Sequence, residues 1–136
     1  MTSYLNTDPD LDEYESILRE YPADVFLVER DHPEEGRSFR FHAPVREAVT
    51  FADEDRARLF ADLYTAVDGF RIGGVGEGGI PVNVAVAGTA EIAAYMYAAW
   101  GQTPTQIAQT LDSNRQNVLE YFERVNDRAE KVIAEE

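Results

Sequence analysis

The segment from Thr103 to Val125 constrains the fold of this chain most, because it holds two apolar stripes of helical period on either side of a short polar break. Spacings of three and four residues place side chains on one face of a helix. Two short helices joined by a tight turn, a helix-turn-helix, are therefore expected. The first stripe is Ile107, Ala108 and Leu111, and the second is Val118, Phe122 and Val125.

Capping residues and polar side chains mark the starts of both helices. Thr103 can cap the first helix, with Pro104 at its first position, and Asp112 or Ser113 can cap the second. In a helix-turn-helix the N-terminal residues of the second helix meet base edges in the major groove. Arg pairs bidentately with guanine, and Asn or Gln with adenine. The candidate base readers are Ser113, Asn114, Arg115, Gln116 and Asn117, and the candidate phosphate contacts are Thr103, Thr105 and Gln106.

On these residues the segment resembles the tri-helical helix-turn-helix of LuxR-type regulators and of region four of bacterial sigma factors. The resemblance rests on Ile107-Ala108, Leu111, Val118 and Val125. It implies that the side chains just before the later Val reach DNA. Two departures are Asp112, in a turn where Gly is common, and the negative charge of Glu120 and Glu123. Carried over by position, the readers are Asn114, Arg115, Gln116 and Asn117, with Tyr121 and Arg124 one and two turns further along.

The charge of the chain opposes DNA binding at first sight. There are 26 acidic and 12 basic residues, for a net charge of −14, whereas a DNA-binding protein is normally basic. The charge is unevenly distributed, however, with −10 on residues 1–88 and −4 on residues 89–136. Between Ile92 and Leu119 the only charged residues are Asp112 and Arg115, which cancel. The expected DNA face is therefore kept free of the acidic load, although a buried helical core would also be poor in charge.

The composition also resembles that of proteins from halophilic archaea, which keep molar salt in the cytoplasm. Of the 12 basic residues 11 are Arg, and Lys131 is the only Lys. At about 1 M salt the Debye length is near 3 Å, so repulsion between an acidic protein and DNA is largely screened. Specific binding would then depend on short-range hydrogen bonds and shape.

Length and residue types limit the remaining possibilities. A chain of 136 residues allows one compact domain, or a small domain followed by the helical unit. We expect an α+β part over residues 1–80 and a helix-turn-helix unit over residues 81–136. No cysteine is present, which excludes disulfides, thiolate catalysis and Cys-based zinc sites. No long apolar run and no basic-apolar leader are present, so a cytoplasmic location without membrane contact is expected.

The N-terminal part is expected to contain a small antiparallel sheet with helices. A first helix is predicted over Leu11–Tyr21, because apolar residues recur there at steps of three and four before Pro22. The run Val25–Val28 suits a buried strand, and alternation predicts two half-exposed strands over Phe39–His42 and Val45–Phe51. Asp31–Gly36 is expected to be a hairpin loop. Asp53 can cap a helix that ends at Gly69, with Leu59, Phe60, Leu63, Tyr64 and Val67 as its apolar face.

A glycine-rich segment, Ile72–Pro81, separates this part from the helix-turn-helix. No Lys-Ser/Thr pair follows the glycines, so a flexible connection or tight turn is favoured over a phosphate-binding loop. Beyond it, either one helix runs from Pro81 to Trp100, or Val82–Val86 is a strand and the helix starts near Thr89. In both cases the helix is the first of the tri-helical unit, with Ile92, Tyr95, Met96 and Ala99 as its buried face.

Other clusters of polar residues favour structural roles. Asp8, Asp10 and Asp12 echo a calcium loop but lack its Gly and its final carboxylate, which favours an acidic helix start. His32 and His42 are the only histidines and are too few for an all-histidine metal site. No set of residues resembles an active site. We therefore expect no enzyme activity, no cofactor and no metal.

The last helix continues past the segment that DNA reading requires. Its apolar stripe advances in alternating steps of four and three over two heptads. Such a helix often packs on another chain, and a homodimer would present two reading helices to a palindromic site. The sequence thus predicts a DNA-binding transcriptional regulator. A protein-interaction adaptor is the alternative, and a small enzyme using the glycine segment is the least favoured. The stripe consists of Val118, Phe122, Val125, Ala129 and Val132.

Overall fold

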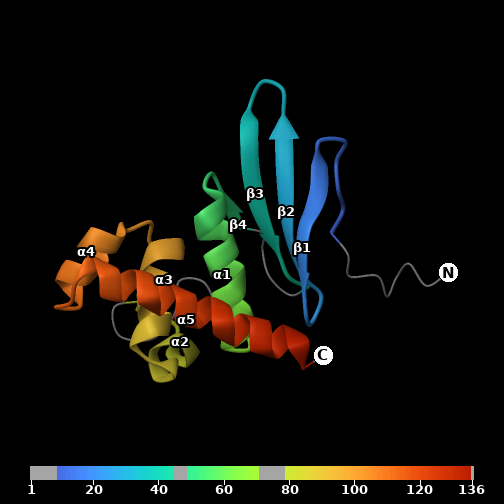
Figure 1. Ribbon diagram of the computed structural model, residues 1–136. Coiled ribbons are helices and arrows are strands. Elements are labelled where there is room, and N and C mark those ends of the chain that lie inside the picture. Colours follow the sequence, from blue (N-terminus) through green and yellow to red (C-terminus); the bar gives the residue numbers. More distant parts are fainter. Residues whose placement is uncertain (1–8, 45–48, 71–78, 136) are drawn as a thin grey trace. The chain divides into compact units, whose positions relative to one another are not determined.

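A computed structural model describes residues 9–44, 49–70 and 79–135 and has an α+β fold. A four-stranded antiparallel sheet comes first in the chain and helices follow (Figure 1). Two compact units are formed, one up to Ala57 and one from Arg58 onward, and helix α1 contributes to both. The predicted fold class is confirmed. The expected boundary after residue 80 stays a prediction.

The sheet is a meander in which strands adjacent in the sequence pair with each other. It contains β1 (Glu15–Tyr21), β2 (Val25–His32), β3 (Gly36–His42) and β4 (Val49–Phe51), in that order. Apolar side chains line up across the strands: Leu27 lies opposite Phe41, which in turn lies opposite Val49. Leu27 and Phe41 are completely buried. Cross-strand packing of this kind stabilises an antiparallel sheet and sets its register.

Two predicted strands and a hairpin turn between them are confirmed, but the turn is shorter than the predicted Asp31–Gly36, because β2 extends to His32 and β3 begins at Gly36. Val25–Val28 is buried throughout, as expected of a strand whose two faces are both covered. Phe39 and Phe41 point to the buried face of β3, while Arg40 and His42 alternate with them. The hairpin turns between His32 and Gly36, where Gly36 has a φ of 83°. Val49–Phe51 forms the predicted last strand, but residues 45–48 lie outside the described residues.

The predicted helix over Leu11–Tyr21 is wrong, since this segment enters and forms strand β1. Its apolar residues do not form a helical stripe: Leu11 is 42% exposed and Ile17 is 38% exposed. The backbone instead pairs with β2, through a turn in which Ala23 and Asp24 have φ values of 64° and 59°. Strand pairing and burial override a weak helical period, because local propensity contributes little compared with tertiary packing.

Because that helix is not formed, the expected acidic helix start near Asp10 and Asp12 is wrong as well. Asp12 instead lies before β1, where its carboxylate accepts a hydrogen bond from the backbone N–H of Tyr14 at 2.8 Å. The same side chain accepts from Arg30 of β2 at 3.2 Å. Asp12 thus fixes the entry of the chain into the sheet. Asp8 lies outside the described residues.

Helix α1 (Glu54–Ala66) begins directly after Asp53 as predicted but ends before the predicted limit at Gly69, so Val67 of the predicted apolar face lies just beyond it. Asp53 accepts a hydrogen bond from the backbone N–H of Asp55 at 3.0 Å at its start. At its end Gly69 has a φ of 89° and donates its N–H to the carbonyl of Tyr64, a left-handed stop that favours glycine. Leu59, Phe60 and Leu63 are buried.

The stretch before the helix-turn-helix forms two helices, α2 (Val82–Ala87) and α3 (Thr89–Ala98). The prediction of one continuous helix is therefore wrong. In the alternative, the strand over Val82–Val86 is wrong, but the helix start near Thr89 is confirmed. The break occurs at Gly88, whose φ of 133° lies in the left-handed range that other residues rarely adopt. Of the Gly-rich segment, residues 72–78 lie outside the described residues.

Helix α3 packs with α4 (Pro104–Thr110) and α5 (Arg115–Ala134) around a small core. Its N-terminal half lies beside the middle of α5, and its C-terminal half lies near the start of α5, where the rings of Tyr97 and Phe122 are 4.8 Å apart. In the part of the chain that is described, no helix is long and apolar enough to cross a membrane. The buried core residues are Ala93, Met96, Ile107, Ala108 and Val118.

Candidate nucleic-acid interface

The turn between α4 and α5 depends on one residue in the left-handed conformation. Asp112 has a φ of 53°, in the left-handed region where glycine is the residue with the least strain. Asp adopts this conformation more readily than most residues. The next residue, Ser113, donates its backbone N–H to the carbonyl of Ala108 at 2.8 Å and closes the turn.

Asn114 caps helix α5, so the expectation that Asp112 or Ser113 is the cap is wrong. The side-chain oxygen of Asn114 accepts the backbone N–H of Asn117 at 2.8 Å. The side-chain nitrogen of Asn117 in turn donates to the hydroxyl of Ser113 at 3.1 Å. Asp112 cannot cap because its backbone is left-handed, whereas a cap residue is extended, as Asn114 is. Three of the predicted base readers therefore stabilise the start of the helix.

The start of α4 is closed in the same way, and here the predicted cap is confirmed. The backbone N–H of Gln106 donates to the hydroxyl of Thr103 at 3.2 Å, and the amide oxygen of Gln106 accepts the N–H of Thr103 at 2.9 Å. This reciprocal pair is a capping box, with Pro104 at the first helical position. Two of the expected phosphate contacts thus bond to each other, and Thr105 is left exposed beside them.

In the first turn of α5, the side chains of Arg115 and Gln116 are exposed and take no part in capping the helix. Neither has a hydrogen bond, ion pair or ring contact to another described residue. They follow the cap directly, in the part of α5 that a helix-turn-helix directs to base edges. Asn117 beside them keeps its amide oxygen free of a described partner, since only its nitrogen bonds Ser113.

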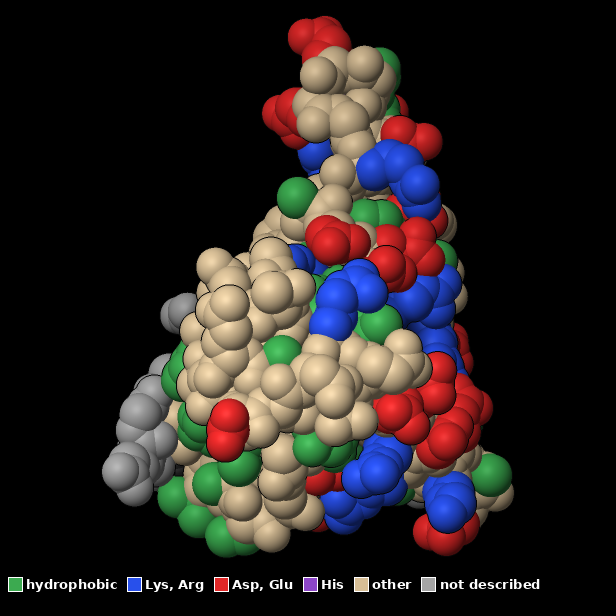
Figure 2. Space-filling model, turned by 60° about the vertical axis from the view of Figure 1, so that its left-hand side comes forward, with side chains coloured by type: hydrophobic (Ala, Val, Ile, Leu, Met, Phe, Trp, Pro, Cys, Tyr) green, Lys and Arg blue, Asp and Glu red, His purple; other side chains and the backbone are tan. Residues whose placement is uncertain are grey.

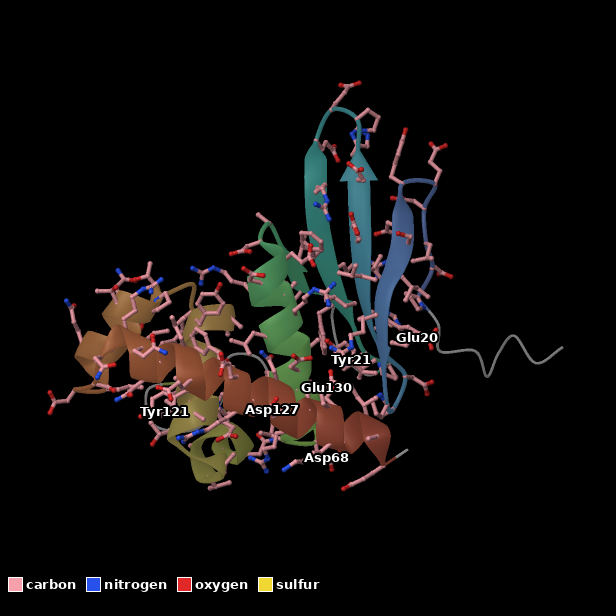
Figure 3. The ribbon with its side chains drawn as sticks, in the orientation of Figure 1. Glu20, Tyr21, Asp68, Tyr121, Asp127 and Glu130 are labelled. Atoms are coloured by element: carbon pink, nitrogen blue, oxygen red, sulfur yellow. The ribbon has the colours of Figure 1, made fainter. Side chains whose placement is uncertain are left out.

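Tyr121 and Arg124 lie further along α5 and act as a pair. Tyr121 is half-buried and packs on the core of the three helices, and its position on α5 is labelled in Figure 3. The guanidinium carbon of Arg124 lies 5.6 Å from the centre of the Tyr121 ring, within the range of a cation–π contact. Part of the Tyr121 side chain is therefore buried against the core, whereas Arg124 is exposed.

The surface formed by α4 and the start of α5 is polar and largely uncharged. In Figure 2 this surface faces the viewer and is mostly tan, the colour of uncharged polar side chains and backbone. Arg115 and Asp112 are its charged residues, and Glu120 and Glu123 follow them, exposed, on α5. The exposed uncharged residues of this surface include Thr103, Thr105, Gln106, Gln109, Thr110, Asn114, Gln116 and Asn117.

Several of the predicted contact residues bond to one another at the helix starts, which the sequence analysis did not predict. Asn is among the preferred residues at a helix start, so the capping role of Asn114 had a signal in the sequence. Arg128 was also missed, although it forms an ion pair with buried Glu91 at 2.9 Å. A lone acid within the Ala-rich stretch of α3 was the available hint.

The other polar residues singled out in the sequence have local partners. His32 is the last residue of β2, and its Nδ1 accepts the backbone N–H groups of Glu34 and Glu35 in the turn that follows. Over the described ranges, no three His, Cys, Asp or Glu side chains are grouped so that they could hold a metal ion. Comparison of the chain with models of protein families, with curated proteins and with solved structures gave no match.

Proposed function

We propose that this protein binds double-stranded DNA with sequence specificity, by placing the first turn of α5 in the major groove. The observation that carries the proposal is the pair Arg115 and Gln116, exposed on that turn and without a partner among the described residues. Their chemistry is complementary to base edges: Arg offers two donors to guanine, and Gln offers a donor and an acceptor to adenine. Transcriptional regulation in the cytoplasm is the role that fits such a reader.

Neighbouring residues support the two readers. The capped ends of α4 and α5 hold the turn and the start of α5 in one conformation, so little ordering is needed on binding. The amide oxygen of Asn117 can accept from a base amino group, and the hydroxyl of Thr105 can donate to a phosphate. Arg124, above the ring of Tyr121, can reach a phosphate further along the groove.

The acidic residues of α5 limit how deeply the helix can enter the groove. Residues on a helix are separated by about 100° of rotation, which places Glu120 and Glu123 on the same exposed side as Gln116. These carboxylates would face phosphates if a longer part of α5 were inserted. We therefore infer that base contact is confined to the first turn, with Arg124 limited to a phosphate outside the groove floor, and that binding requires salt high enough to screen the charge of −14.

The test is selection of bound sequences from a random duplex pool at about 2 M KCl, the regime in which the Debye length falls to a few ångströms. The wild type is compared with Arg115→Ala/Gln116→Ala. We expect the wild type to enrich one motif and the double variant to lose it. A single bidentate contact discriminates between bases by about 1 to 3 kcal/mol, so each single variant should relax one base position.

Lys131→Ala is the matched control, because it removes one positive charge from the far end of the same helix. It is expected to lower the affinity for all sequences alike and to leave the enriched motif in place. A folded wild type that enriches nothing, or a double variant that still enriches the same motif, would refute the proposal.

A protein-interaction adaptor is the second candidate, and the surface of α2 favours it. Val82 is 53% exposed and Val86 is 77% exposed, and both lie on this short helix. Trp100, after α3, is 42% exposed. Exposed apolar groups often mark protein contacts. An adaptor would tolerate Arg115→Ala and would lose its partner on Val86→Ser, whereas a DNA reader would behave in the opposite way.

Homodimerisation remains part of the proposal, but most of the apolar stripe on α5 is buried against other helices of the same chain. Val118, Val125 and Ala129 are completely buried within one copy. A dimer would therefore have to use other surfaces. The spacing of half-sites in the selected DNA motif would reveal it, because two-fold symmetry in the protein is mirrored in the operator.

A further inference from the structure

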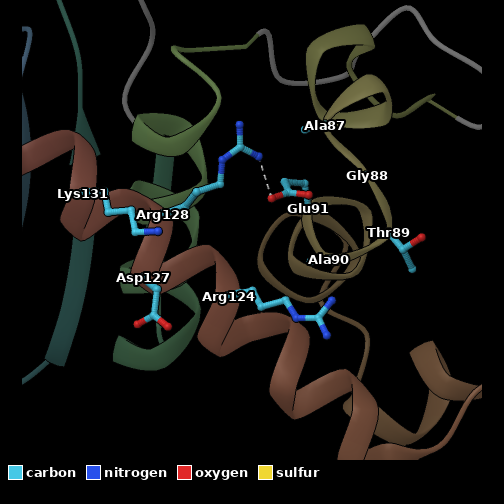
Figure 4. Close-up of a pocket in the computed structure, with 9 residues that line it drawn as sticks. All are labelled: Ala87, Gly88, Thr89, Ala90, Glu91, Arg124, Asp127, Arg128 and Lys131. Atoms are coloured by element: carbon cyan, nitrogen blue, oxygen red, sulfur yellow. Dashed lines mark hydrogen bonds and ion pairs between the residues drawn. The ribbon is translucent and has the colours of Figure 1, made fainter.

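Three of the four cations between residues 79 and 135 surround one hollow of the surface. Arg124, Arg128 and Lys131 project from the second half of α5, and Arg115 is the fourth cation. The hollow has a volume of about 520 Å³, and its other wall is formed by residues Ala87 to Glu91. Figure 4 shows these side chains around it. In a chain with a net charge of −14, such a gathering of positive charge is unusual.

One of the cations is already neutralised by a buried acid. The side chain of Glu91 is only 6% exposed, and its Oε2 accepts a hydrogen bond from the Nη1 of Arg128 at 2.9 Å. A buried carboxylate is costly without a partner, so Arg128 has a structural role at this wall. Glu91 and Arg128 therefore contribute shape and hydrogen-bond donors to the hollow, but no net charge.

The other two cations keep their charge available. Arg124 and Lys131 have no ion pair among the described residues, and the ring of Tyr121 beside Arg124 is uncharged. Asp127 is the second carboxylate of the lining, so the five ionisable groups carry a net charge of +1. The facing backbone of α3 begins at Gly88, where no side chain caps the helix.

We propose that this hollow binds a phosphate group, held by Arg124 and Lys131 against the wall that Arg128 and Glu91 keep in place. A phosphate presents several acceptor oxygens and up to two negative charges, which match donors arriving from different directions. The hollow shares Arg124 with the proposed DNA contacts but lies away from the base readers: at about 1.5 Å per residue, Arg124 and Lys131 lie about 14 and 24 Å along α5 from Arg115. The phosphate group can belong to a small phosphorylated compound or to a DNA backbone.

The test is a titration of the whole protein with inorganic phosphate, followed by the backbone amide NMR signals, with KCl added to keep the ionic strength constant. We expect saturable shifts at Thr89 and Ala90, which lie in the wall. Arg124→Gln and Lys131→Gln should each weaken the affinity for phosphate by about tenfold, the effect of losing one charge-assisted hydrogen bond. Both side chains are exposed, so neither change should unfold the protein.

Arg115→Gln is the matched control, because it removes the same charge from the other end of α5 and should leave the phosphate titration as it is. A second titration uses a mixed-sequence DNA duplex. Shifts at Thr89 and Ala90 with inorganic phosphate indicate that the hollow binds a small phosphorylated compound. Shifts with the DNA duplex but not with inorganic phosphate indicate that it binds a phosphate of the DNA backbone. The proposal is overturned if neither probe gives saturable shifts there, or if the shifts survive both Arg124→Gln and Lys131→Gln.

Discussion

Asp112 has the left-handed backbone conformation of the turn between α4 and α5. Two substitutions at this position are therefore expected to change the free energy of unfolding in opposite directions. Its φ of 53° is tolerated by Asp, free of penalty for Gly and unfavourable for Ala. We expect Asp112→Gly to raise the free energy of unfolding by about 0.5 kcal/mol and Asp112→Ala to lower it by about 1 kcal/mol. Urea denaturation followed by circular dichroism measures both. Equal stability of the Ala and Gly variants would contradict a left-handed residue at this position.

The residues at the start of α5 also show what sequence alone can and cannot predict about the site. Asn at a helix start can cap the helix or read adenine, and both roles need the same residue type in nearly the same place. The choice depends on which residue is the last with extended backbone angles, and this is Asn114, with φ −128° and ψ 164°. Arg115 and Gln116 come one residue later, and for that reason their side chains are left for a ligand.

Elements were predictable where one period dominates the sequence. The alternating strands, the hairpin loop and the stripes of α4 and α5 follow directly from side-chain spacing. Strand β1 was missed because its apolar residues recur at steps of three and four, while its conformation is decided by pairing with β2. The break at Gly88 was expected only in the alternative with a helix start near Thr89, because a single glycine is tolerated within many helices and its φ of 133° is needed to identify the interruption.

A network of charged side chains next to the first two strands of the sheet predicts that the stability of the fold depends on pH. Arg30 bonds the carboxylates of Asp12 and Glu35. The pKa of Glu35 is lowered chiefly by this hydrogen bond from Arg30, whereas the pKa of Asp12 is lowered first by the N–H of Tyr14 and then by Arg30. Both carboxylates thus stabilise the fold above about pH 4, and this stabilisation is lost as the pH falls through their lowered pKa values.

Arg30→Met should therefore raise the pKa of Glu35 toward its ordinary range, with the lowering by His32 still present, and raise the pKa of Asp12 by less, since Asp12 keeps the N–H of Tyr14. Titration of the carboxyl carbon signals by NMR measures both values. Arg37→Met, which removes a cation paired with Glu29 on the same hairpin, is the control and should leave the pKa of Glu35 lowered. An unchanged pKa of Glu35 in Arg30→Met would show that Arg30 is not its partner in solution.

The chain combines a strongly acidic composition with a surface on α4 and the start of α5 that carries little charge, and this combination governs how DNA binding should depend on salt. In the described part of the chain, Arg115 is the one cation on the surface of α4 and the start of α5, with Arg124 further along. Each phosphate that a cation neutralises contributes about −0.9 to the slope of log K against log salt concentration. A slope between about −1 and −2 is therefore expected, far from the values near −10 of strongly basic DNA-binding proteins.

Fluorescence anisotropy with the selected duplex, between about 0.2 and 2 M KCl, measures this slope; across that range the Debye length falls from about 7 to about 2 Å. Repulsion between the acidic surface and DNA is strongest at the low end, so affinity there should rise with added salt before the shallow decline begins. Arg115→Gln should remove about one unit of slope as well as one base preference, because the same side chain supplies the charge and the readout. A slope of −5 or steeper in the wild type would mean that DNA binds through cations outside the start of α5.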